Sequence, residues 1–347
     1  MNPLGMKHYD VIIAGAGPAG LRCAEILAPS GLKVLLLEKK QSIGQKVCAG
    51  GITRKLFSIY DFPETLIETS IHKILLSASH RQHLIQSRSN FLFTIDRKVL
   101  GLWQLSRIKN SAIDIQTAAR LSHIEKNYVV VNREDRYTYT YLVGADGSSS
   151  LVRRHLHIPA KKYIMALQYK IPYGKAGIAS EIHLDSNYFH AGYGWIFPHK
   201  DYLAVGCGAD PRFISPKKLK AHFHQWLNEK HFDITHSSYE SFPILYDYRG
   251  FQFGNIFLAG DAAGLASGLT GEGILPALVS GEEVAKRILD KNHKPKAMEV
   301  LIRHKRKQEN ILRFLNWTGP LRNTVFNIIL LCLKNEGFNR RLTKGFS

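Results

Sequence analysis

Three glycines near the N-terminus have the spacing that binds the phosphates of a dinucleotide. Gly15, Gly17 and Gly20 form a G-x-G-x-x-G pattern that also contains Pro18 and Ala19. The first glycine permits a tight turn, the second lets the backbone approach a pyrophosphate, and the third lets a helix pack closely on a strand. A glycine-rich turn that binds no ligand is the competing interpretation.

The sequence on either side of these glycines supplies the elements that position them. Residues 9–14 form an apolar, β-branched run typical of a buried parallel strand, and residues 21–28 are expected to form the helix whose N–H groups face the phosphates. A second apolar strand over residues 33–37 ends at Glu38, whose carboxylate can accept a hydrogen bond from a ribose hydroxyl. We expect Glu38 and the adjacent Lys39 to contact the cofactor.

A second candidate segment lies late in the chain. The apolar strand expected over residues 255–259 runs into Gly260 and Asp261. A carboxylate at the end of a parallel strand can accept a hydrogen bond from a ribityl hydroxyl. The alternative is an ordinary strand–loop–helix unit with a solvated aspartate.

A helix N-terminus follows this carboxylate. Gly271, Gly273 and Ile274 lead into a helix expected over residues 274–289, with Pro276 in its first turn, where a missing N–H costs little. The backbone donors and positive dipole end of such a helix would stabilise the negative charge that a flavin gains on its pyrimidine side upon reduction. The two glycine-rich segments, in this order, predict FAD held by a single discontinuous domain.

A third segment lies between the other two. A Tyr/Thr-rich strand is expected over residues 137–143, and Asp146 and Gly147 then form a tight turn that returns the chain to the cofactor. A short helix is expected to begin at Leu151.

These three motifs, in this order, resemble those of the group A flavoprotein monooxygenase and reductase superfamily, which has a hydroxybenzoate-hydroxylase-like FAD domain. Within it, the chain resembles the geranylgeranyl reductase family at two stretches. Lys46–Ile52 is similar to the family's cysteine-glycine segment beside the isoalloxazine, and Tyr193–Pro198 is similar to its YxWxFP signature, whose aromatics face the lipid pocket. The resemblance covers about residues 8 to 290.

The resemblance also implies roles for individual residues. Arg97 is similar to the arginine that opens a helix near the FAD phosphates, and Cys48 to a proton donor or pocket wall, although a small apolar role for this thiol is an alternative. The substrate contacts implied in the same way are Gly50, Gly51, Tyr193, Trp195, Phe197 and Pro198.

The three aromatic residues of the second stretch alternate along an expected strand, so their side chains share one face. An apolar face of this kind suits an isoprenoid chain. Plain core packing is the alternative.

The resemblance implies an FAD-dependent oxidoreductase that reduces C=C bonds of a polyprenyl lipid or diphosphate by hydride transfer from flavin N5. An FAD-dependent monooxygenase acting on an aromatic or quinone is the alternative within the same fold, and a non-enzymatic flavin-binding lipid carrier is a third. No second G-x-G-x-x-G follows a strand. We therefore expect transient NAD(P)H, or an electron-donor protein, as the reductant.

The charge balance favours an anionic partner. Among 347 residues, 47 Lys and Arg oppose 28 Asp and Glu, a net charge of +19. This attracts anionic lipid headgroups or a diphosphate, whereas no nucleic-acid motif accompanies it; a basic soluble surface is the alternative.

Basic residues flank the apolar stretch 325–333, which is too short to span a bilayer because that requires about 20 apolar residues. It is expected either to lie at a membrane interface or to close over the pocket as a buried helix.

The cysteines exclude two kinds of chemistry. Cys23, Cys48, Cys207 and Cys332 form no CxxC pair, so the sequence predicts neither a metal site nor a redox-active dithiol. The first apolar run is the nucleotide-binding strand, which argues against a signal peptide. The expected location is cytoplasmic, with peripheral membrane contact as an addition.

The expected fold class is α/β, a Rossmann-like FAD-binding domain of hydroxybenzoate-hydroxylase type with an inserted antiparallel-sheet substrate domain and a helical C-terminus. The FAD domain is expected over residues 1–60, 91–155 and 251–290, and the substrate domain over 61–90 and 156–250. Residues 291–347 form the helical, basic C-terminal region.

Overall fold

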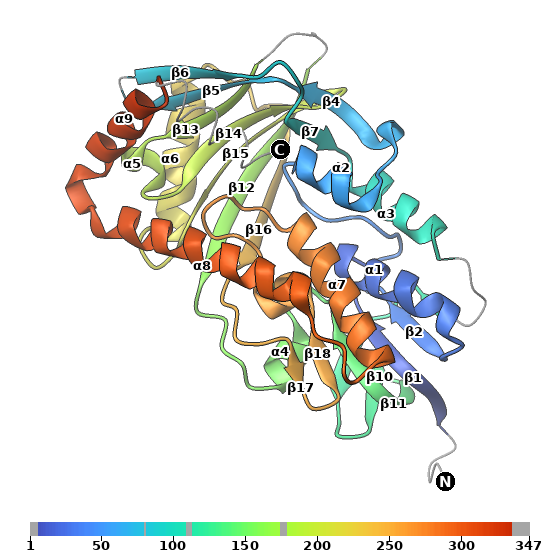
Figure 1. Ribbon diagram of the computed structural model, residues 1–347. Helices are drawn as coiled ribbons and strands as arrows, with labels where there is room; N and C mark the ends of the chain where they lie inside the picture. The colour runs from blue at the N-terminus through green and yellow to red at the C-terminus, as the bar shows by residue number, and fades with distance from the viewer. Residues whose placement is uncertain (1–5, 80, 109–112, 174–178, 335–347) are drawn as a thin grey trace. The chain divides into compact units, whose positions relative to one another are not determined.

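The computed structural model describes residues 6–79, 81–108, 113–173 and 179–334 (Figure 1). The chain divides into two compact units, each described here by itself. Unit 1 comprises residues 1–46, 98–163 and 244–307, and unit 2 comprises residues 47–97, 164–243 and 308–347.

Unit 1 is built on a mainly parallel sheet whose strand order is β17-β18-β11-β1-β2-β8. The parallel strands are β1 (Lys7–Ala14), β2 (Val34–Leu37), β8 (Ile113–Gln116), β11 (Asp135–Gly144) and β18 (Ile256–Leu258). Antiparallel strands β17 (Gln252–Phe253), β10 (Tyr128–Val131) and β9 (Leu121–Ile124) extend it. Ile12 and Ile13 in the central strand β1 are fully buried, as expected for a sheet covered on both faces.

The helices of unit 1 that carry the motifs are α1 (Pro18–Leu27), α4 (Leu151–His155) and α7 (Ile274–Leu289), with a 3₁₀ turn at η3 (Gly260–Ala263). Helices α4 and α7 begin at the predicted residues, Leu151 and Ile274. Helix α1 starts three residues earlier than predicted because Pro18 is pre-organised for the first helical position. The other elements are η1 (Ala28–Ser30), α3 (Arg97–Ser106) and α8 (Lys296–Trp317); α3 and α8 each cross the division between the units.

Unit 2 contains a seven-stranded sheet of order β16-β12-β15-β14-β13-β5-β6. Its strands are β5 (Lys73–Ala78), β6 (Arg81–Gln86), β12 (Tyr163–Pro172), β13 (Ser180–Leu184), β14 (Tyr193–Pro198), β15 (Tyr202–Ala209) and β16 (Ser238–Leu245). The expected sheet was antiparallel throughout, but β5 and β13 pair in parallel. The reason is that β5 comes from a distant part of the chain, so no hairpin fixes its direction.

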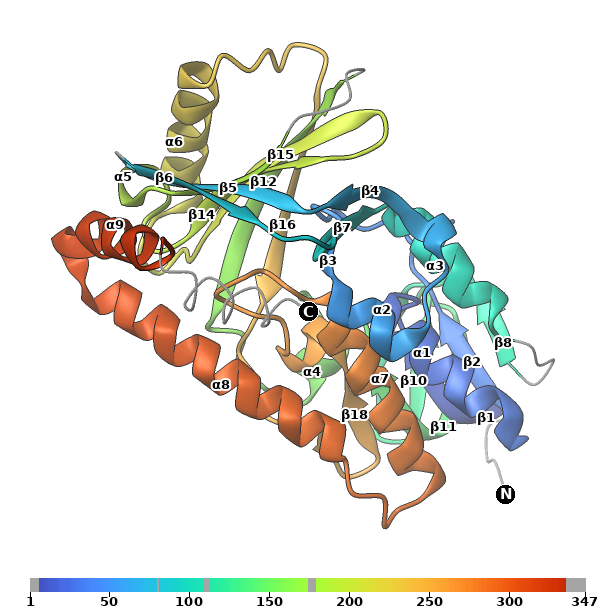
Figure 2. The same cartoon turned by 45° about the horizontal axis from the view of Figure 1, so that its top comes forward.

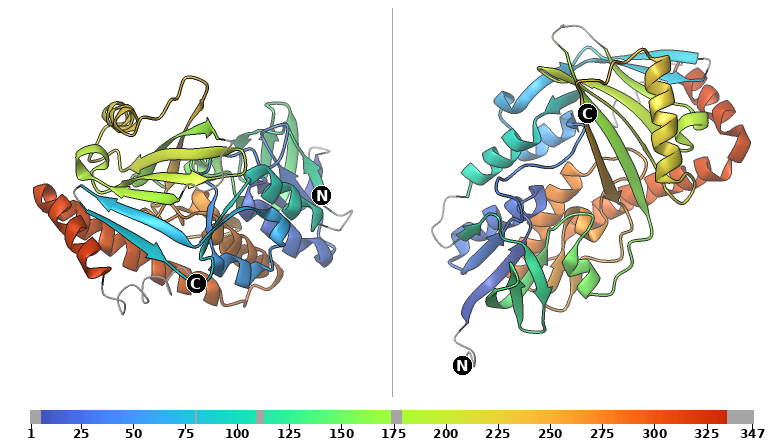
Figure 3. Two further views of the ribbon diagram at one scale, coloured as in Figure 1. Left: turned by 90° about the horizontal axis from the view of Figure 1, so that it is seen from above. Right: turned by 180° about the vertical axis from the view of Figure 1, so that it is seen from behind.

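Helices cover this sheet within unit 2. Helix α6 (Pro216–Glu229) lies on one face (Figure 3), where Phe223, Trp226 and Leu227 join a core with residues of β12 and β15. The short helix α5 (Ser186–Phe189) contacts α6, and α9 (Arg322–Cys332) packs beside β5 and β6 (Figure 2). The turn η4 (Gly319–Leu321) precedes α9.

A second, three-stranded sheet of unit 2 carries the cysteine-glycine segment. Strand β7 (Leu92–Ile95) lies between β3 (Gly51–Thr53) and β4 (Ile67–Ile71), and α2 (Arg54–Tyr60) and η2 (Glu64–Leu66) connect β3 to β4. Residues 47–60, which we assigned to the FAD domain, lie in unit 2 because β3 pairs with β7.

The C-terminal region is helical over its described part. In α9, Phe326, Leu330 and Leu333 at its C-cap are buried while Ile328 and Leu331 are exposed, so the apolar stretch is a half-buried helix. Among the described residues, no helix is long and apolar enough to cross a membrane. The same residues contain no cluster of His, Cys, Asp and Glu side chains that could hold a metal ion.

Helices α1 and α7 approach each other so closely that Gly281 has no room for a side chain. A Cβ at Gly281 would lie 2.2 Å from the backbone oxygen of Ala19. Alanine usually stabilises a helix interior by roughly 0.5–1 kcal/mol relative to glycine. We expect Gly281→Ala to lower the free energy of unfolding by about 1–3 kcal/mol instead, because the helices must separate.

Urea denaturation measures this change. Asn310→Ala, at an exposed position of α8, is the control and should leave the free energy of unfolding nearly unchanged. Stabilisation by Gly281→Ala would show that the helices separate without cost.

Candidate functional site

The glycine loop between β1 and α1 leaves open space at one position only. A Cβ at Gly15, whose φ is +103°, would lie 2.4 Å from the Ala145 oxygen, and one at Gly20 would lie 1.9 Å from the Gly15 oxygen. At Gly17, by contrast, an added Cβ would meet nothing within 4 Å. Gly15 and Gly20 thus permit close packing, and the space at Gly17 in front of the α1 N-terminus fits a phosphate group.

Glu38 is fixed beside this loop. Its Oε2 accepts a hydrogen bond from the Ala16 N–H at 3.0 Å, and its Oε1 accepts one from the Lys40 N–H, also at 3.0 Å. Each oxygen keeps a lone pair, so the carboxylate can still accept a hydroxyl proton. Lys39 is exposed at the edge of the same loop.

Asp261 lies at the end of β18 and is bound from two directions. Its Oδ2 accepts hydrogen bonds from Lys46 Nζ at 2.8 Å and Ser148 Oγ at 3.1 Å. A Cβ at Gly273 would lie 3.3 Å from Asp261 Oδ1, which shows that the start of α7 faces this carboxylate. The structure thus brings Asp261 together with Lys46 and Ser148, two partners that sequence reasoning did not assign to the site.

The N-terminus of α7 is well suited to an anionic group. Its N-cap Gly273 makes no side-chain capping hydrogen bond, and its first turn contains no acidic residue. Gly271 has a φ of +68°, which lets the chain turn sharply into Gly273 and Ile274. Backbone donors and the positive helix end therefore remain available to a ligand. Gly260, the other predicted loop residue, has a φ of +58°.

Asp146 has a structural role that the sequence did not predict. Its Oδ2 accepts hydrogen bonds from the N–H groups of Leu151 at 2.7 Å and Val152 at 3.3 Å, so it holds the start of α4. Burial raises the pKa of Asp146 above its usual range. Its Oδ1 is buried without a hydrogen-bond partner. Beside it, a Cβ at Gly147 would meet nothing within 4 Å.

Arg97, the first residue of α3, has a buried Nε atom without a hydrogen-bond partner. A buried guanidinium donor left unpaired is costly unless a ligand supplies an acceptor. This orphaned donor is chemically suited to a phosphate group.

In unit 2, Cys48 begins a glycine-rich turn held by polar contacts. Cys48 is a half-buried free thiol, and its Sγ accepts a hydrogen bond from the Gly50 N–H at 3.3 Å. Gln168 Nε2 donates to the Cys48 carbonyl oxygen at 3.3 Å and to Glu240 Oε2 at 2.6 Å. Lys170 Nζ lies 3.4 Å from Glu240 Oε1.

The aromatic strand β14 packs through its alternate side chains. The rings of Tyr193 and Trp195 meet edge-to-face with centroids 5.9 Å apart, which places them on one face. Trp195 packs onto Gly206, and its Nε1 is buried without a hydrogen-bond partner. Phe197 reaches Gly51, where an added Cβ would lie 3.1 Å from its ring.

Sequence reasoning did not identify His199, the residue that follows this strand. His199 is buried against the cysteine-glycine turn. The last residue of the strand, Pro198, accepts a hydrogen bond at its carbonyl oxygen from Thr94 Oγ1 at 2.8 Å. His199 Nδ1 lies 2.5 Å from Glu68 Oε2, and its ring stacks on Tyr202 at 4.3 Å. The position of His199 directly after the aromatic motif could have indicated that it belongs to the site. Glu68 lies 131 residues away in the sequence, and no local pattern pointed to it.

The predicted residues thus form two sets, one in each unit. The predicted cofactor contacts lie in unit 1, apart from Arg97 at its boundary; the implied substrate contacts lie in unit 2.

Comparison with known proteins agrees with the resemblance stated above. Residues 4–88 match the Thi4 family. The chain is 28% identical to an uncharacterized protein of Methanosarcina barkeri over 90% of this chain and 82% of that protein. It is 27% identical to a geranylgeranyl diphosphate reductase of Rhodobacter capsulatus, over 80% of this chain and 74% of that one. It is also 27% identical to a digeranylgeranylglycerophospholipid reductase of Methanococcus vannielii, over 83% of this chain and 79% of that one.

Solved structures confirm the predicted fold class. A geranylgeranyl bacteriochlorophyll reductase-like protein from Thermoplasma acidophilum superimposes with a TM-score of 0.77 at 22% identity, over 95% of this chain and 92% of that one. A probable FAD-dependent monooxygenase from Pseudomonas aeruginosa gives a TM-score of 0.68 at 15% identity, over 94% and 100% of the two chains.

The two glycines after Cys48 should differ in their tolerance of a side chain. At Gly50, with a φ of +74°, an added Cβ would lie 2.5 Å from His199 Cε1 and 2.7 Å from the Ile95 oxygen. Gly50→Ala should therefore lower the free energy of unfolding by at least about 2 kcal/mol. Gly51→Ala requires only a small movement of the Phe197 ring, so it should lower the free energy of unfolding by less than about 1 kcal/mol.

Chemical denaturation of both variants measures the difference. Equal losses of stability would contradict the tight contact between Gly50 and His199.

Proposed function

We propose that this chain, a relative of the geranylgeranyl reductases with the fold of FAD-dependent monooxygenases, is an FAD-dependent oxidoreductase that reduces C=C bonds of a polyprenyl lipid or diphosphate. The proposal rests on the similarity to two proteins named as reductases of geranylgeranyl compounds. The similarity covers 80% of this chain for one and 83% for the other, a span that includes both units. Fold alone cannot decide between reduction and oxygenation.

Residues of unit 1 suit the binding of FAD. The space at Gly17 would take the phosphates, Glu38 a ribose hydroxyl and Asp261 a ribityl hydroxyl. The uncapped start of α7 offers donors for the negative charge of the reduced cofactor. When bound and reduced, FAD supplies the hydride.

In unit 2, Cys48 is the proposed proton donor. Addition of hydride to one alkene carbon requires a proton at the other, and a half-buried free thiol can give one. The Gly50 N–H, already bound to Sγ, would stabilise the thiolate that remains. Phe197 beside Gly51, and Tyr193 beside Trp195, supply apolar surface for an isoprenoid chain.

We also propose peripheral contact with an anionic membrane through the C-terminal helices. Ile311, Phe314 and Trp317 are exposed within two turns of α8, and Trp317 is 82% exposed. Such aromatic and aliphatic side chains suit a membrane interface. Arg322, one of the basic residues that flank the apolar stretch, is buried and donates to the Leu315 oxygen.

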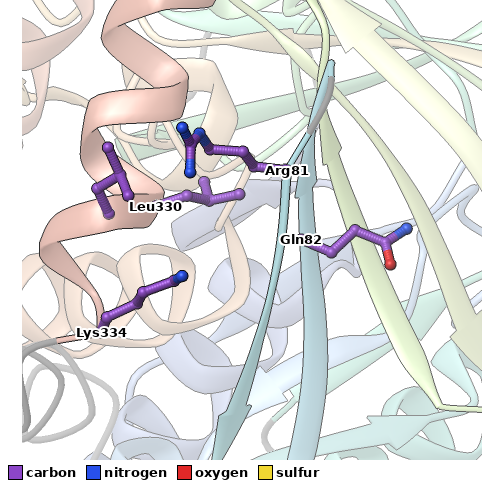
Figure 4. Close-up of a pocket in the computed structure, with 5 residues that line it drawn as sticks. Arg81, Gln82, Leu330 and Lys334 are labelled. Carbon is purple, nitrogen blue, oxygen red and sulfur yellow. The ribbon is translucent and has the colours of Figure 1, made fainter.

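Basic side chains lie on the same part of unit 2. Figure 4 shows Arg81 extending from β6 toward Leu330 of α9, in a small pocket that Gln82, Leu331 and Lys334 also line. Two cations, Arg81 and Lys334, beside leucine side chains suit the anionic headgroup of a membrane lipid.

Loss of the Asp261 carboxylate should release the flavin. Asp261→Ala removes a charged hydrogen-bond acceptor and leaves Lys46 without that partner, so FAD affinity should fall roughly tenfold or more. The ratio of flavin to protein, from the visible absorbance of the purified protein, measures the change. Asp290→Ala, an exposed carboxylate after α7, is the matched control; normal flavin occupancy in Asp261→Ala would contradict the assignment.

The reaction itself is tested with the dithionite-reduced protein, so the outcome does not depend on whether NAD(P)H or an electron-donor protein is the reductant. The protein is incubated anaerobically with geranylgeranyl diphosphate, a prenyl phospholipid in anionic or neutral vesicles, and a prenylquinone. We expect product masses that gain pairs of hydrogens on one substrate class, with faster turnover in the anionic vesicles. Cys48→Ala should lower this turnover roughly 100-fold or more while leaving flavin bound.

Two outcomes would redirect the assignment. Oxygen incorporation into a quinone or aromatic compound when air is admitted, without hydrogen gain, would indicate a monooxygenase. Unchanged turnover in Cys48→Ala would remove the thiol from the chemistry.

A further inference from the structure

A β-bulge aims one carboxylate at the cysteine-glycine turn of unit 2. Where β4 pairs with β7, Ile67 lies opposite Ile95 and Thr69 opposite Thr94, so Glu68 is the extra residue between them. A bulge re-aims the side chain that it carries. Here Glu68 Oε2 lies 2.5 Å from His199 Nδ1.

The second nitrogen of His199 fixes the proton count of this pair. His199 Nε2 lies 3.0 Å from the carbonyl oxygen of Ala49, which can only accept a hydrogen bond. Nε2 must therefore carry a proton. The close contact between Nδ1 and the Glu68 carboxyl then requires a second proton, held on either partner. With this second proton, the contact with Ala49 and the contact with Glu68 are attractive at the same time. With only one proton on the pair, one of the two contacts would be repulsive.

The His199 ring has no room to turn away from these partners. Its side chain is 1% exposed, and it stacks on Tyr202 with ring planes 9° apart. Gly50 also lies against the ring, where even a Cβ would lie 2.5 Å from His199 Cε1. Loss of the shared proton would therefore set an unprotonated nitrogen against an oxygen at one of the two contacts.

Several titratable groups lie near the His199–Tyr202 stack. They include Glu68, Asp96, Glu240, Cys48 and Lys170, and Lys200 and Asp201 lie between the two rings in the chain. Lys170 Nζ lies 5.5 Å from the centre of the Tyr202 ring. Burial and the nearby acids raise the pKa of Tyr202, so its phenol stays neutral.

We propose that the His199–Glu68 pair is a positioning pair that holds one shared proton and thereby fixes the Ala49 carbonyl and the Cys48–Gly51 turn. Without that proton, the turn loosens and the Cys48 thiol is no longer held in place. The effect on catalysis rests on the proposed function, whereas the proton and its effect on the turn do not.

Histidine NMR tests the proton directly. In protein with ¹⁵N-labelled histidine at neutral pH, His199 should be protonated at Nε2 in every form, and Glu68→Gln should leave it neutral with Nδ1 accepting from the new amide. His199→Phe, which preserves stacking on Tyr202, identifies the resonances. A neutral His199 with its proton on Nδ1 would overturn the proposal.

Alkylation of Cys48 by iodoacetamide, followed as the Cys48 peptide by mass spectrometry, tests the turn. The wild-type rate should rise in two steps with pH, one from the thiol itself and one of about tenfold from loss of the shared proton. Glu68→Gln should show only the first step, because its amide and the imidazole satisfy both contacts without a titratable proton.

A second buried pair in unit 2 provides the matched control. His183 Nε2 lies 2.7 Å from Glu181 Oε2 in β13, so Glu181→Gln should leave the two-step profile of Cys48 unchanged. Superimposable profiles for wild type and Glu68→Gln would overturn the proposal. Both measurements use the protein without substrate, so a chain that reduces no prenyl compound could still hold this pair, and the two failures are distinguishable.

Discussion

The architecture of unit 1 depends on backbones that approach each other more closely than any side chain allows. Helix α1 lies against the glycine loop because Gly20 has no Cβ to meet the Gly15 oxygen, and α7 lies against α1 because Gly281 has none to meet Ala19. The sheet edge, α1 and α7 are thereby held in one arrangement. The two helix N-termini that can face an anionic ligand both belong to this arrangement.

The same constraint recurs in unit 2 with a different purpose. Gly50 has no side chain that would clash with the His199 imidazole, and Gly206 has none that would clash with the Trp195 indole. These glycines bring large side chains, rather than a second helix, against the backbone. In the same unit, Trp195 Nε1 is buried without a hydrogen-bond partner, and Cys48 is a half-buried free thiol whose Sγ accepts from the Gly50 N–H. A buried donor without a partner is found where a ligand completes the bonding.

Carboxylates perform distinct tasks at the two sites. Asp146 holds the start of α4, and its burial favours the protonated form. Asp261 is paired with a lysine and can still accept a further hydrogen bond. Glu68 shares a proton with a histidine. Their environments, rather than their residue type, separate these roles.

The sequence by itself determined the strand–loop–helix motifs, because their signals are local: apolar runs, glycines at fixed spacing and a carboxylate at a strand end. The strands around the glycine loop, the extent of α7 and the alternation along β14 followed from such patterns. Tertiary structure alone decided which distant side chains meet. Lys46 and Asp261 are 215 residues apart, and Glu68 and His199 are 131 apart. The parallel pairing of β5 with β13 is of the same kind. Local pattern fixes which way a side chain faces within its element, whereas the packing of elements fixes its partner, and no spacing in the sequence encodes that packing.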